Sequence, residues 1–252
     1  MNRSDQRRQK GSGTYWLYGL HAARAALRNP RRTVLKIALT EQVQRELQHA
    51  IGPDIPTEVS VFERIARIVP PGAVHQGVAL LCEPLPLLDL DDALEATTTA
   101  KRRIAVLDQI TDPHNEGAIL RSAAAFGFSM VIVQSRHSPP ESGVLAKAAS
   151  GALDQVSRVT VVNIARALED LARLGVWRIA LAADGSEEIR HALPPGDVAI
   201  VLGAEGTGVR RLVRERCDIS AFIPMDGMME SLNVSNAAAI AFYEAARVPE
   251  RK

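Results

Sequence analysis

Cysteine and long apolar runs are scarce in this sequence, and each absence excludes a class of protein. Only Cys82 and Cys217 occur among the 252 residues, and each stands alone. This excludes a disulfide framework and a cysteine-rich zinc module, so we expect both to be small buried side chains. No apolar run reaches the ~18 residues of a membrane span, and no apolar segment follows the basic start as in a signal peptide. We therefore expect a cytoplasmic protein that does not enter a membrane.

The two common glycine patterns for nucleotide phosphates are also missing. The sequence contains neither Gly-x-Gly-x-x-Gly nor Gly-x-x-x-x-Gly-Lys-[Ser/Thr]. Its nearest approach, Gly203-Ala-Glu-Gly-Thr-Gly208, indicates only that backbone comes close to something there, with glycines accommodating positive φ. The composition, 46% hydrophobic and 23% charged, is otherwise typical of a globular protein with one large or two small cores.

The net charge is only +1, but basic residues are concentrated at the start of the chain. Residues 1–36 hold nine lysines or arginines against one acid, Asp5, whereas the remainder carries 21 basic and 28 acidic residues. A basic arm of this kind is typical of proteins that bind the phosphate backbone of a nucleic acid. It is equally compatible with a solvated tail that keeps the protein soluble.

The distribution of apolar segments predicts two domains. Residues 1–14 are polar and are expected to be a disordered tail. Residues 15–83 predict a small α/β domain, 84–100 a linker with a short helix near 90–96, and 101–252 a second domain. In the small domain we expect a helix from Tyr18-Gly19 to Asn29-Pro30, a strand at 34–39, a helix at 41–50, a strand at 57–61, a helix at 62–67 and a strand at 77–82.

The second domain alternates short apolar runs with helical patterns, which predicts a parallel α/β sheet. The expected strands are 104–107, 130–133, 177–183 and 198–202. Between them, Ile164, Leu168, Leu171 and Leu174 recur at helical spacing behind Asn163, a good N-cap, and predict an amphipathic crossover helix.

Three polar, glycine-containing segments follow strand-like runs in this second domain. They are Asp112–Ser122, Leu202–Gly208 and Ile223–Ser235. Ligands in α/β proteins bind beyond the carboxyl ends of parallel strands, so the three segments predict one composite pocket.

In this order and spacing, the three segments resemble motifs 1, 2 and 3 of the SpoU (TrmH) branch of the SPOUT methyltransferases. Ser231-Leu-Asn-Val-Ser235 after Ile223-Pro-Met225 is the most specific match. The resemblance implies S-adenosylmethionine as cofactor, no metal, and methylation of a ribose 2′-hydroxyl in RNA by in-line displacement. It also implies a SPOUT-type parallel sheet with a C-terminal deep trefoil knot, and a homodimer that completes each site. Phe242 and Tyr243 are candidate dimer contacts, although burial within one subunit would explain them equally well.

The segments Tyr18–Ala22 and Val74–Val78 resemble the substrate-binding domain of bacterial ribosomal members of this family. That domain has a fold similar to ribosomal protein L30e. The resemblance therefore favours a guanosine in 23S ribosomal RNA as the target. Two alternatives remain: methylation of transfer RNA, and a non-catalytic RNA-binding or ribosome-assembly factor on the same fold.

Carried over position by position, the resemblance assigns the site residues. The active-site residues it implies are Asn115, Arg121, Glu205, Ser231 and Asn233. The cofactor-contacting residues it implies are Ala183, Gly203, Gly206, Ile223, Met225 and Leu232.

Several of these residues have a second interpretation. Arg121 is suited to pairing bidentately with a phosphate, and because a guanidinium hardly ever deprotonates, we assign it orientation of the RNA instead of base catalysis. Asn233 could instead be a helix N-cap, and Glu205 could answer a helix macrodipole. His114 is expected to be a loop residue that packs or caps. The arginines at 210, 211, 214 and 216 predict either an RNA-facing stripe or a solvated helix face.

Two residues depart from the usual motifs. Glu116 stands where motif 1 is usually apolar, and Glu230 stands where the related ribosomal subgroup commonly has a small residue. Neither position belongs to the predicted site, but both leave the target nucleotide open.

Overall fold

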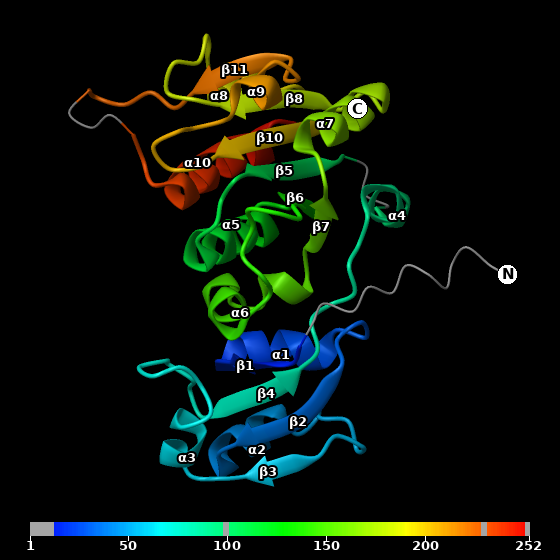
Figure 1. Cartoon of the computed structure of the whole chain (residues 1–252), viewed down its shortest axis with the longest axis vertical. Helices are drawn as coiled ribbons and strands as arrows, with labels where there is room; N and C mark the ends of the chain where they lie inside the picture. The colour runs from blue at the N-terminus through cyan, green and yellow to red at the C-terminus, as the bar shows by residue number, and fades with distance from the viewer. Residues whose placement is uncertain (1–12, 98–100, 228–230, 250–252) are drawn as a thin grey trace, which may run out of the picture. The chain divides into compact units, whose positions relative to one another are not determined.

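The computed structural model describes residues 13–97, 101–227 and 231–249, which form two compact units (Figure 1). The first unit contains the chain up to Leu87 together with Pro140–Gln155, and the second contains Leu88–Pro139 and the chain from Val156. The predicted tail at 1–14 and the departure at Glu230 fall almost wholly outside the described residues. No described helix is long and apolar enough to span a membrane.

The first unit is built on a four-stranded sheet of order β1-β4-β2-β3. Its elements before Leu87 are β1 (Tyr15–Tyr18), α1 (Leu20–Arg28), β2 (Val34–Leu39), α2 (Glu41–Leu47), β3 (Thr57–Val59), α3 (Phe62–Ala66) and β4 (Val78–Cys82). The predicted helices and strands are confirmed, with ends that differ by a few residues. Strand β1 was not predicted, because its four residues are too few to show a period and acquire strand geometry only by pairing antiparallel with β4.

The two segments that resemble a substrate-binding domain lie side by side in this unit. The side-chain oxygen of Gln76 accepts hydrogen bonds from the Leu20 backbone, at 3.2 Å, and from Lys147 Nζ, at 2.7 Å. Gln76 has a positive φ of 55°, and its side chain reaches the first residue of α1. Its contact with Lys147 also shows that a distant part of the chain joins this unit.

That distant part is the segment 140–155, which contains α6 (Gly143–Ala149) and a 3-10 turn at Ala152–Asp154. Helix α6 contacts β1 so closely that a methyl group on Gly143 would overlap the carbonyl oxygen of Trp16. The predicted boundaries place this segment within 101–252, whereas its contacts are with the N-terminal elements. No local signal carries this information, because the packing joins residues more than 100 positions apart.

Arg32 is the centre of the polar contacts in the first unit. Its side chain is fully buried and pairs with Asp154, at 2.8 Å, and with Glu141. It also donates to the hydroxyl of Tyr15, at 3.1 Å, and to the carbonyl of Glu83, at 3.2 Å. Two carboxylates from the segment 140–155 therefore neutralise a cation from the N-terminal part, which fixes the segment to this unit.

The second unit contains a seven-stranded parallel sheet of order β7-β6-β5-β10-β8-β11-β9. Its strands are β5 (Arg103–Asp108), β6 (Met130–Gln134), β7 (Ser157–Val161), β8 (Trp177–Leu181), β9 (Glu187–Glu188), β10 (Val198–Gly203) and β11 (Ile219–Phe222). Its helices are α4 (Leu90–Ala96), α5 (Pro113–Ala125), α7 (Ile164–Arg173), α8 (Ile189–Ala192), α9 (Arg211–Arg214) and α10 (Val234–Arg247). The predicted parallel α/β sheet is confirmed.

Helices cover both faces of this sheet. Helices α4, α7 and α9 share one apolar core with Ile104 and Val106 of β5. On the alternate face, α5 packs along α10, and the rings of Phe128 and Phe242 lie 4.0 Å apart. Phe242 is thus buried within the chain, which excludes it as a dimer contact, whereas Tyr243 is 47% exposed.

Some details differ from the sequence predictions. Strand β7 was missed, because Ser157-Arg-Val-Thr-Val161 is a polar, half-buried edge strand without a continuous apolar run. Helix α5 begins at Pro113, capped by Asp112, about two residues before the predicted start, so His114 is an exposed helical residue and not a loop residue. Helix α7 has the predicted Asn163 cap, but Leu174 lies beyond its end and is 51% exposed. The short helix of the predicted linker, α4, is part of the core.

Candidate active site

The three predicted segments meet at the carboxyl edge of the second unit's sheet. The first follows β5, the second follows β10, and the third follows β11 and leads into α10. Strands β5 and β10 are neighbours in parallel register, with Asp108 opposite Gly203, so their following loops start side by side. This arrangement brings together residues that are about 90 to 120 positions apart in the chain.

A hydrogen-bonded cluster joins one residue from each segment. Asn115 Nδ2 donates to Glu205 Oε1 at 3.1 Å, and Asn233 Nδ2 donates to the same oxygen at 2.6 Å. Asn233 Nδ2 also lies 3.0 Å from Asn115 Oδ1 and donates to it. Among the described residues no side chain donates to Oε2 of Glu205. The cluster therefore presents one carboxylate oxygen that is already bonded and one that is open.

Asn233 has both of the roles that the sequence left open. Its Oδ1 accepts from the backbone N–H of Ser235, at 2.9 Å, which caps α10. Its amide nitrogen bonds the two other members of the cluster. A single side chain thus anchors the start of α10 and holds the cluster, because an amide has separate donor and acceptor ends. Glu205 does not lie at the next helix, which begins only at Arg211, but its carboxylate lies 2.6 Å from the amide of the N-cap residue of α10 and so stands beside a helix N-terminus.

The loop that carries Glu205 is folded tightly back on the end of β10. Gly208 N–H donates to the carbonyl of Ala204 at 2.9 Å, and a methyl group on Gly203 would overlap the backbone of Gly208 and Val209. Gly206 and Gly208 have φ of 82° and 64°, in the left-handed region that favours glycine. The glycines of this loop are therefore explained by its own turn.

A buried carboxylate that was not predicted holds the far end of this loop. Asp108 is fully buried at the end of β5, and its two oxygens accept from Nε and the backbone N–H of Arg210, at 2.7 and 2.9 Å. Arg210 also donates to Gln134 Oε1, at 3.1 Å. Asp108 stands at the end of a predicted strand, where a polar residue could have been noticed. Its partner lies 102 positions away and leaves no local signal.

Beside the cluster lies a pocket of about 390 Å³. Its lining includes every residue predicted to contact a cofactor, namely Ala183, Gly203, Gly206, Ile223, Met225 and Leu232, and also Glu205 and Ser231. Other lining residues were not predicted and lie within two positions of predicted residues or one turn into α10: Leu181, Ala182, Leu202, Ala204, Gly208, Val234 and Ala237.

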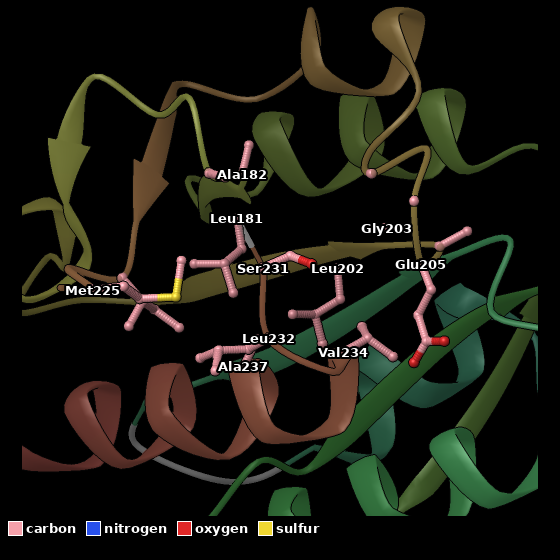
Figure 2. Close-up of a pocket in the computed structure, with 15 residues that line it drawn as sticks. Leu181, Ala182, Leu202, Gly203, Glu205, Met225, Ser231, Leu232, Val234 and Ala237 are labelled. Atoms are coloured by element: carbon pink, nitrogen blue, oxygen red, sulfur yellow. The ribbon is translucent and has the colours of Figure 1, made fainter. Parts of the chain in front are cut away.

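The pocket has an apolar interior and a polar end. In the view of Figure 2, Leu181, Leu202 and Leu232 lie between Met225 at one side and Glu205 at the other. Such a volume and lining suit a small ligand with a flat apolar ring and a polar, charged part. S-Adenosylmethionine, with its adenine ring and its sulfonium, amine and carboxylate groups, fits this description.

Arg121 and Ser231 are not members of the hydrogen-bonded cluster. Arg121 lies on α5, six residues after Asn115, which corresponds to about 9 Å along the helix axis. Its side chain is exposed and makes no hydrogen bond or ion pair within the described part of the chain. Ser231 is exposed and lines the pocket. An exposed guanidinium without a carboxylate partner remains available to an anionic ligand.

The arginines near α9 behave differently, because each already has a carboxylate partner. Arg210 pairs with Asp108, Arg211 with Glu215, Arg214 with Asp184, and Arg216 with Glu169. These pairs favour a solvated, internally neutralised surface over an RNA-facing stripe.

The departure at Glu116 is explained by an ion pair. Glu116 is fully buried and pairs with Arg158 at 2.5 Å, which accounts for an acid at a usually apolar position.

Neither cysteine takes part in the site. Cys82 is buried in the first unit and Cys217 is partly buried beside the core of the second, and both are free thiols. Burial raises the pKa of each thiol to about 12, so both stay protonated at neutral pH. Cys82 is thus the small buried residue that was expected, whereas Cys217 is only partly buried.

Sequence comparison relates this chain to enzymes that modify RNA. Residues 102–243 match the profile of the SpoU rRNA Methylase family, and residues 16–88 match that of RNA 2'-O ribose methyltransferase substrate binding. The 23S rRNA (guanosine-2'-O-)-methyltransferase RlmB of Vibrio vulnificus is 38% identical over 239 residues, which cover 92% of this chain and 96% of that protein. The protein of the same name from Ralstonia nicotianae is 39% identical over 237 residues, 92% of this chain and 94% of its own length.

Solved structures agree with this relationship. The SpoU methyltransferase AviRb from Streptomyces viridochromogenes, in complex with the cofactor AdoMet, superposes with a TM-score of 0.79 over 100% of this chain and 96% of that one, at 22% identity. The TrmH/SpoU tRNA modifying enzyme of A. aeolicus matches 58% of this chain and 75% of its own, with a TM-score of 0.53 and 28% identity. The pocket and the cluster beside it therefore lie in a protein that belongs to the SpoU rRNA methylase family.

Proposed function

We propose that this protein is an S-adenosylmethionine-dependent methyltransferase that modifies the ribose 2′-hydroxyl of a guanosine in 23S ribosomal RNA. The observation that carries the proposal is the meeting of an apolar pocket and a polar cluster, built from three segments, at one edge of the sheet. Relatives named for this reaction match 92% of the chain at 38 to 39% identity. Since the substrate is ribosomal RNA, we place the activity in the cytoplasm.

The pocket residues are proposed to hold the cofactor. Leu181, Leu202 and Leu232 offer the apolar surface on which an adenine ring would pack, and Gly203 leaves room for backbone to approach it. When bound, the sulfonium supplies a methyl group that is already activated for transfer. No metal is then needed for the chemistry, and the protein must align the acceptor and accept its proton.

The cluster is proposed to orient the acceptor ribose. The two amide groups of Asn115 and Asn233 point their donors at one oxygen of Glu205, which fixes the direction of its carboxylate. The open oxygen, Oε2, can then accept a hydrogen bond from a ribose hydroxyl. Ser231, at the rim of the pocket, is short enough to bond the same hydroxyl without filling the methyl's path.

Arg121 is proposed to hold the RNA phosphate beside the target ribose. Its guanidinium is exposed and has no described partner, which is unusual in this unit. A guanidinium pairs bidentately with a phosphate and remains charged throughout, so it can orient the substrate and stabilise charge but not act as a base.

We also propose that the last two loops form the family's deep trefoil knot, and that residues 15–83 adopt the L30e-like fold and bind RNA. The strand order is compatible with the knot, since β10 lies between β5 and β8 while β11 pairs on the other side of β8, so the last connections pass over neighbouring strands.

A homodimer is proposed through the outer face of α10. Ile240 and Tyr243 are 38% and 47% exposed on that helix, and the ring of Tyr243 packs edge-on against Phe126. Exposed apolar residues on a helix whose other face is buried are typical of a subunit interface. Light scattering at micromolar concentration tests this: a dimer is expected for the native protein, and a monomer for Ile240→Glu.

Transfer RNA is the second candidate substrate. The tRNA modifying enzyme of A. aeolicus matches only 58% of this chain, whereas the relatives named for 23S rRNA match 92%. The family profile for substrate binding, over residues 16–88, further favours the ribosomal substrate. A non-catalytic role is disfavoured because the predicted site residues are all present.

Mapping of ribose methylation in total RNA decides between these substrates. Deletion of the gene is expected to remove 2′-O-methylation at one guanosine of 23S rRNA, and the native gene is expected to restore it. A variant with Arg121→Ala should not restore it. Loss at a tRNA nucleotide would assign the second substrate, and an unchanged map would overturn the enzymatic proposal.

A further inference from the structure

Most arginines of the second unit are paired, and the exceptions mark a surface. Every described arginine of this unit has a carboxylate within 4.0 Å except Arg103, Arg121, Arg136 and Arg166. Arg103 is half-buried at the amino end of β5. The other three are exposed and follow the carboxyl ends of β5, β6 and β7, which are consecutive in the sheet. Arg136 and Arg166 therefore lie near one edge of the sheet, whereas Arg121 is the ninth residue of the helix that starts at this edge.

The loop after β6 presents Arg136 and His137 at a closed tip. Ser138 Oγ donates to the carbonyl of Gln134 at 2.7 Å, which closes the loop at its base. The carbonyl of Pro139 accepts from Arg158 Nη2 at 2.9 Å, and Arg158 is itself held by the buried Glu116. His137 adopts a positive φ of 68° between these anchors. The loop is thus held at both ends, and its basic tip points away from the core.

The neighbouring segment after β7 extends the same exposed surface. Val162, 82% exposed, is tied to β6 because its carbonyl accepts from Gln134 Nε2 at 3.3 Å. Arg166 follows in the first turn of α7, whose backbone is capped by Asn163. We name this surface, made of Arg136, His137, Val162 and Arg166, the β6–β7 rim. It combines two free guanidinium groups with an imidazole and an exposed apolar side chain.

A chain of hydrogen bonds connects the β6–β7 rim to the candidate active site. Gln134 bonds Val162 on one side and Arg210 on the other, and Arg210 bonds Asp108 at the base of the loop that carries Glu205. Because adjacent strands are about 4.8 Å apart, β7 lies on the order of 15 Å from β10. The rim is therefore a few nucleotides away from the cluster along the same edge.

We infer that the β6–β7 rim is a second RNA contact, which holds the strand flanking the target ribose through Arg136 and Arg166. This inference rests on the proposed function. Free guanidinium groups bind phosphate oxygens, and His137 and Val162 offer faces on which an unpaired base can stack or pack. Carboxylates along this edge already have partners: Asp108 pairs with Arg210, Glu116 pairs with Arg158, and one oxygen of Glu205 accepts from the amides. Asp112 caps α5.

Paired substitutions with equal change of charge test this surface. The rim variant is Arg136→Ala/Arg166→Ala, and the control is Arg173→Ala/Arg216→Ala, which removes two exposed arginines that already pair with Asp170 and Glu169. Binding to unmethylated 23S rRNA is measured at two salt concentrations, with cofactor binding and thermal unfolding as checks on folding. Steady-state methylation then separates KM for RNA from kcat.

The rim variant is expected to bind the RNA on the order of 10- to 100-fold more weakly than the control. Its log–log salt slope should fall by about 1.4, as for two lost single-strand phosphate contacts. KM for RNA should rise with it, while cofactor affinity stays unchanged. Arg136→Lys/Arg166→Lys should keep the salt slope, because the charges remain.

Equal weakening in the control would reduce the effect to net charge and overturn the inference. Unchanged RNA binding in the rim variant, or a loss of cofactor affinity, would overturn it as well. Failure of the proposed function looks different, because the native protein would then not methylate 23S rRNA at all. If the native protein is active and the rim variant equals it, only the rim assignment fails.

Discussion

Arg32 in the first unit and Arg121 in the second use the same side chain in opposite ways. Arg32 is fully buried between Asp154 and Glu141, and hydrogen bonds and charges from these groups keep its pKa above the usual value despite burial. Arg121 is exposed and has no carboxylate near it among the described residues. The first arginine is therefore part of the packing, whereas the second is free to take a ligand. The two arginines thus differ in burial and in the presence of a carboxylate partner, and their substitutions are expected to affect different properties.

The largest effect is expected where a charge enters the pocket of the second unit. Leu232→Arg would place a guanidinium against an apolar wall, so binding of S-adenosylmethionine should be lost. Leu212→Arg, on the 63% exposed face of α9 outside the pocket, is the matched control and should bind normally. Titration calorimetry with and without EDTA measures both. Normal binding by Leu232→Arg, or binding by the native protein that needs a divalent ion, would contradict the site.

Removal of the structural arginine should cost stability and leave the pocket intact. Arg32→Met leaves two buried carboxylates without their cation, which destabilises by about 3 to 5 kcal/mol. The exposed pair of Arg24 and Glu46 offers the control, because Arg24→Met should cost less than about 1 kcal/mol. Urea unfolding of the full chain measures both. Equal costs would show that burial does not distinguish the two pairs.

Removal of the free arginine should do the reverse. Arg121→Ala is expected to lower single-turnover methyl transfer by on the order of 100-fold, because alignment of the ribose is lost, with a change in unfolding free energy within about 0.5 kcal/mol. RNA binding should weaken by only about 1 to 3 kcal/mol. Arg121→Lys keeps the charge without the planar fork and should recover binding more than rate. Full activity of Arg121→Ala would remove it from the site.

Asn233 combines a structural and a functional role, and two substitutions separate them. Asn233→Ser retains a cap for α10, whereas Asn233→Ala should cost about 1 kcal/mol of stability. Both remove the amide that bonds Glu205, so both should lose methyl transfer to a similar extent. Thermal unfolding and single-turnover rates give the two readouts. An active serine variant would mean that only the cap matters.

The smallest effect concerns pH and the first unit. Burial, with a further contribution from Lys147, lowers the pKa of His75 below its usual range, and its Nε2 is buried without a described partner. The unfolded chain therefore binds the proton more readily, so stability present above about pH 6.5 is lost as the pH falls. Unfolding measured between pH 7 and 5 should show a steeper loss for the native protein than for His75→Gln. Equal slopes would assign the loss to other groups.

The sequence predicted helices and strands well wherever an apolar run or a capping residue marks them locally. The strand at 34–39 and the cap at Asn163 were found because apolar runs and capping residues act within a few positions. The pocket residues followed from the family resemblance, since nothing local indicates that 203, 223 and 232 share one cavity. Two features depend on contacts across about 100 residues and could not be predicted from local sequence. They are the pair of Asp108 with Arg210 and the packing of residues 140–155 in the first unit.

The membership of residues 140–155 in the first unit limits how the two units can be tested separately. A truncation of residues 1–82, which the predicted boundaries suggest, would strip Glu141, Asp154 and Lys147 of their partners. The remaining protein would carry an unsupported helix and two unpaired carboxylates. A loss of RNA binding by such a truncation would therefore say little about RNA recognition, which is why point substitutions are preferable.

The return of the chain to its first unit also sets an order for synthesis. Arg32 leaves the ribosome long before Asp154, and residues 88–139 must be made between the two parts of the unit. At about 5 to 20 residues per second, synthesis of residues 88–155, roughly 70 residues, delays completion of the first unit by about 4 to 14 s. During that interval the nascent N-terminal part has an arginine without its carboxylates and a sheet without α6. A newly made chain is thus exposed to chaperones and proteases for seconds before its first unit can close.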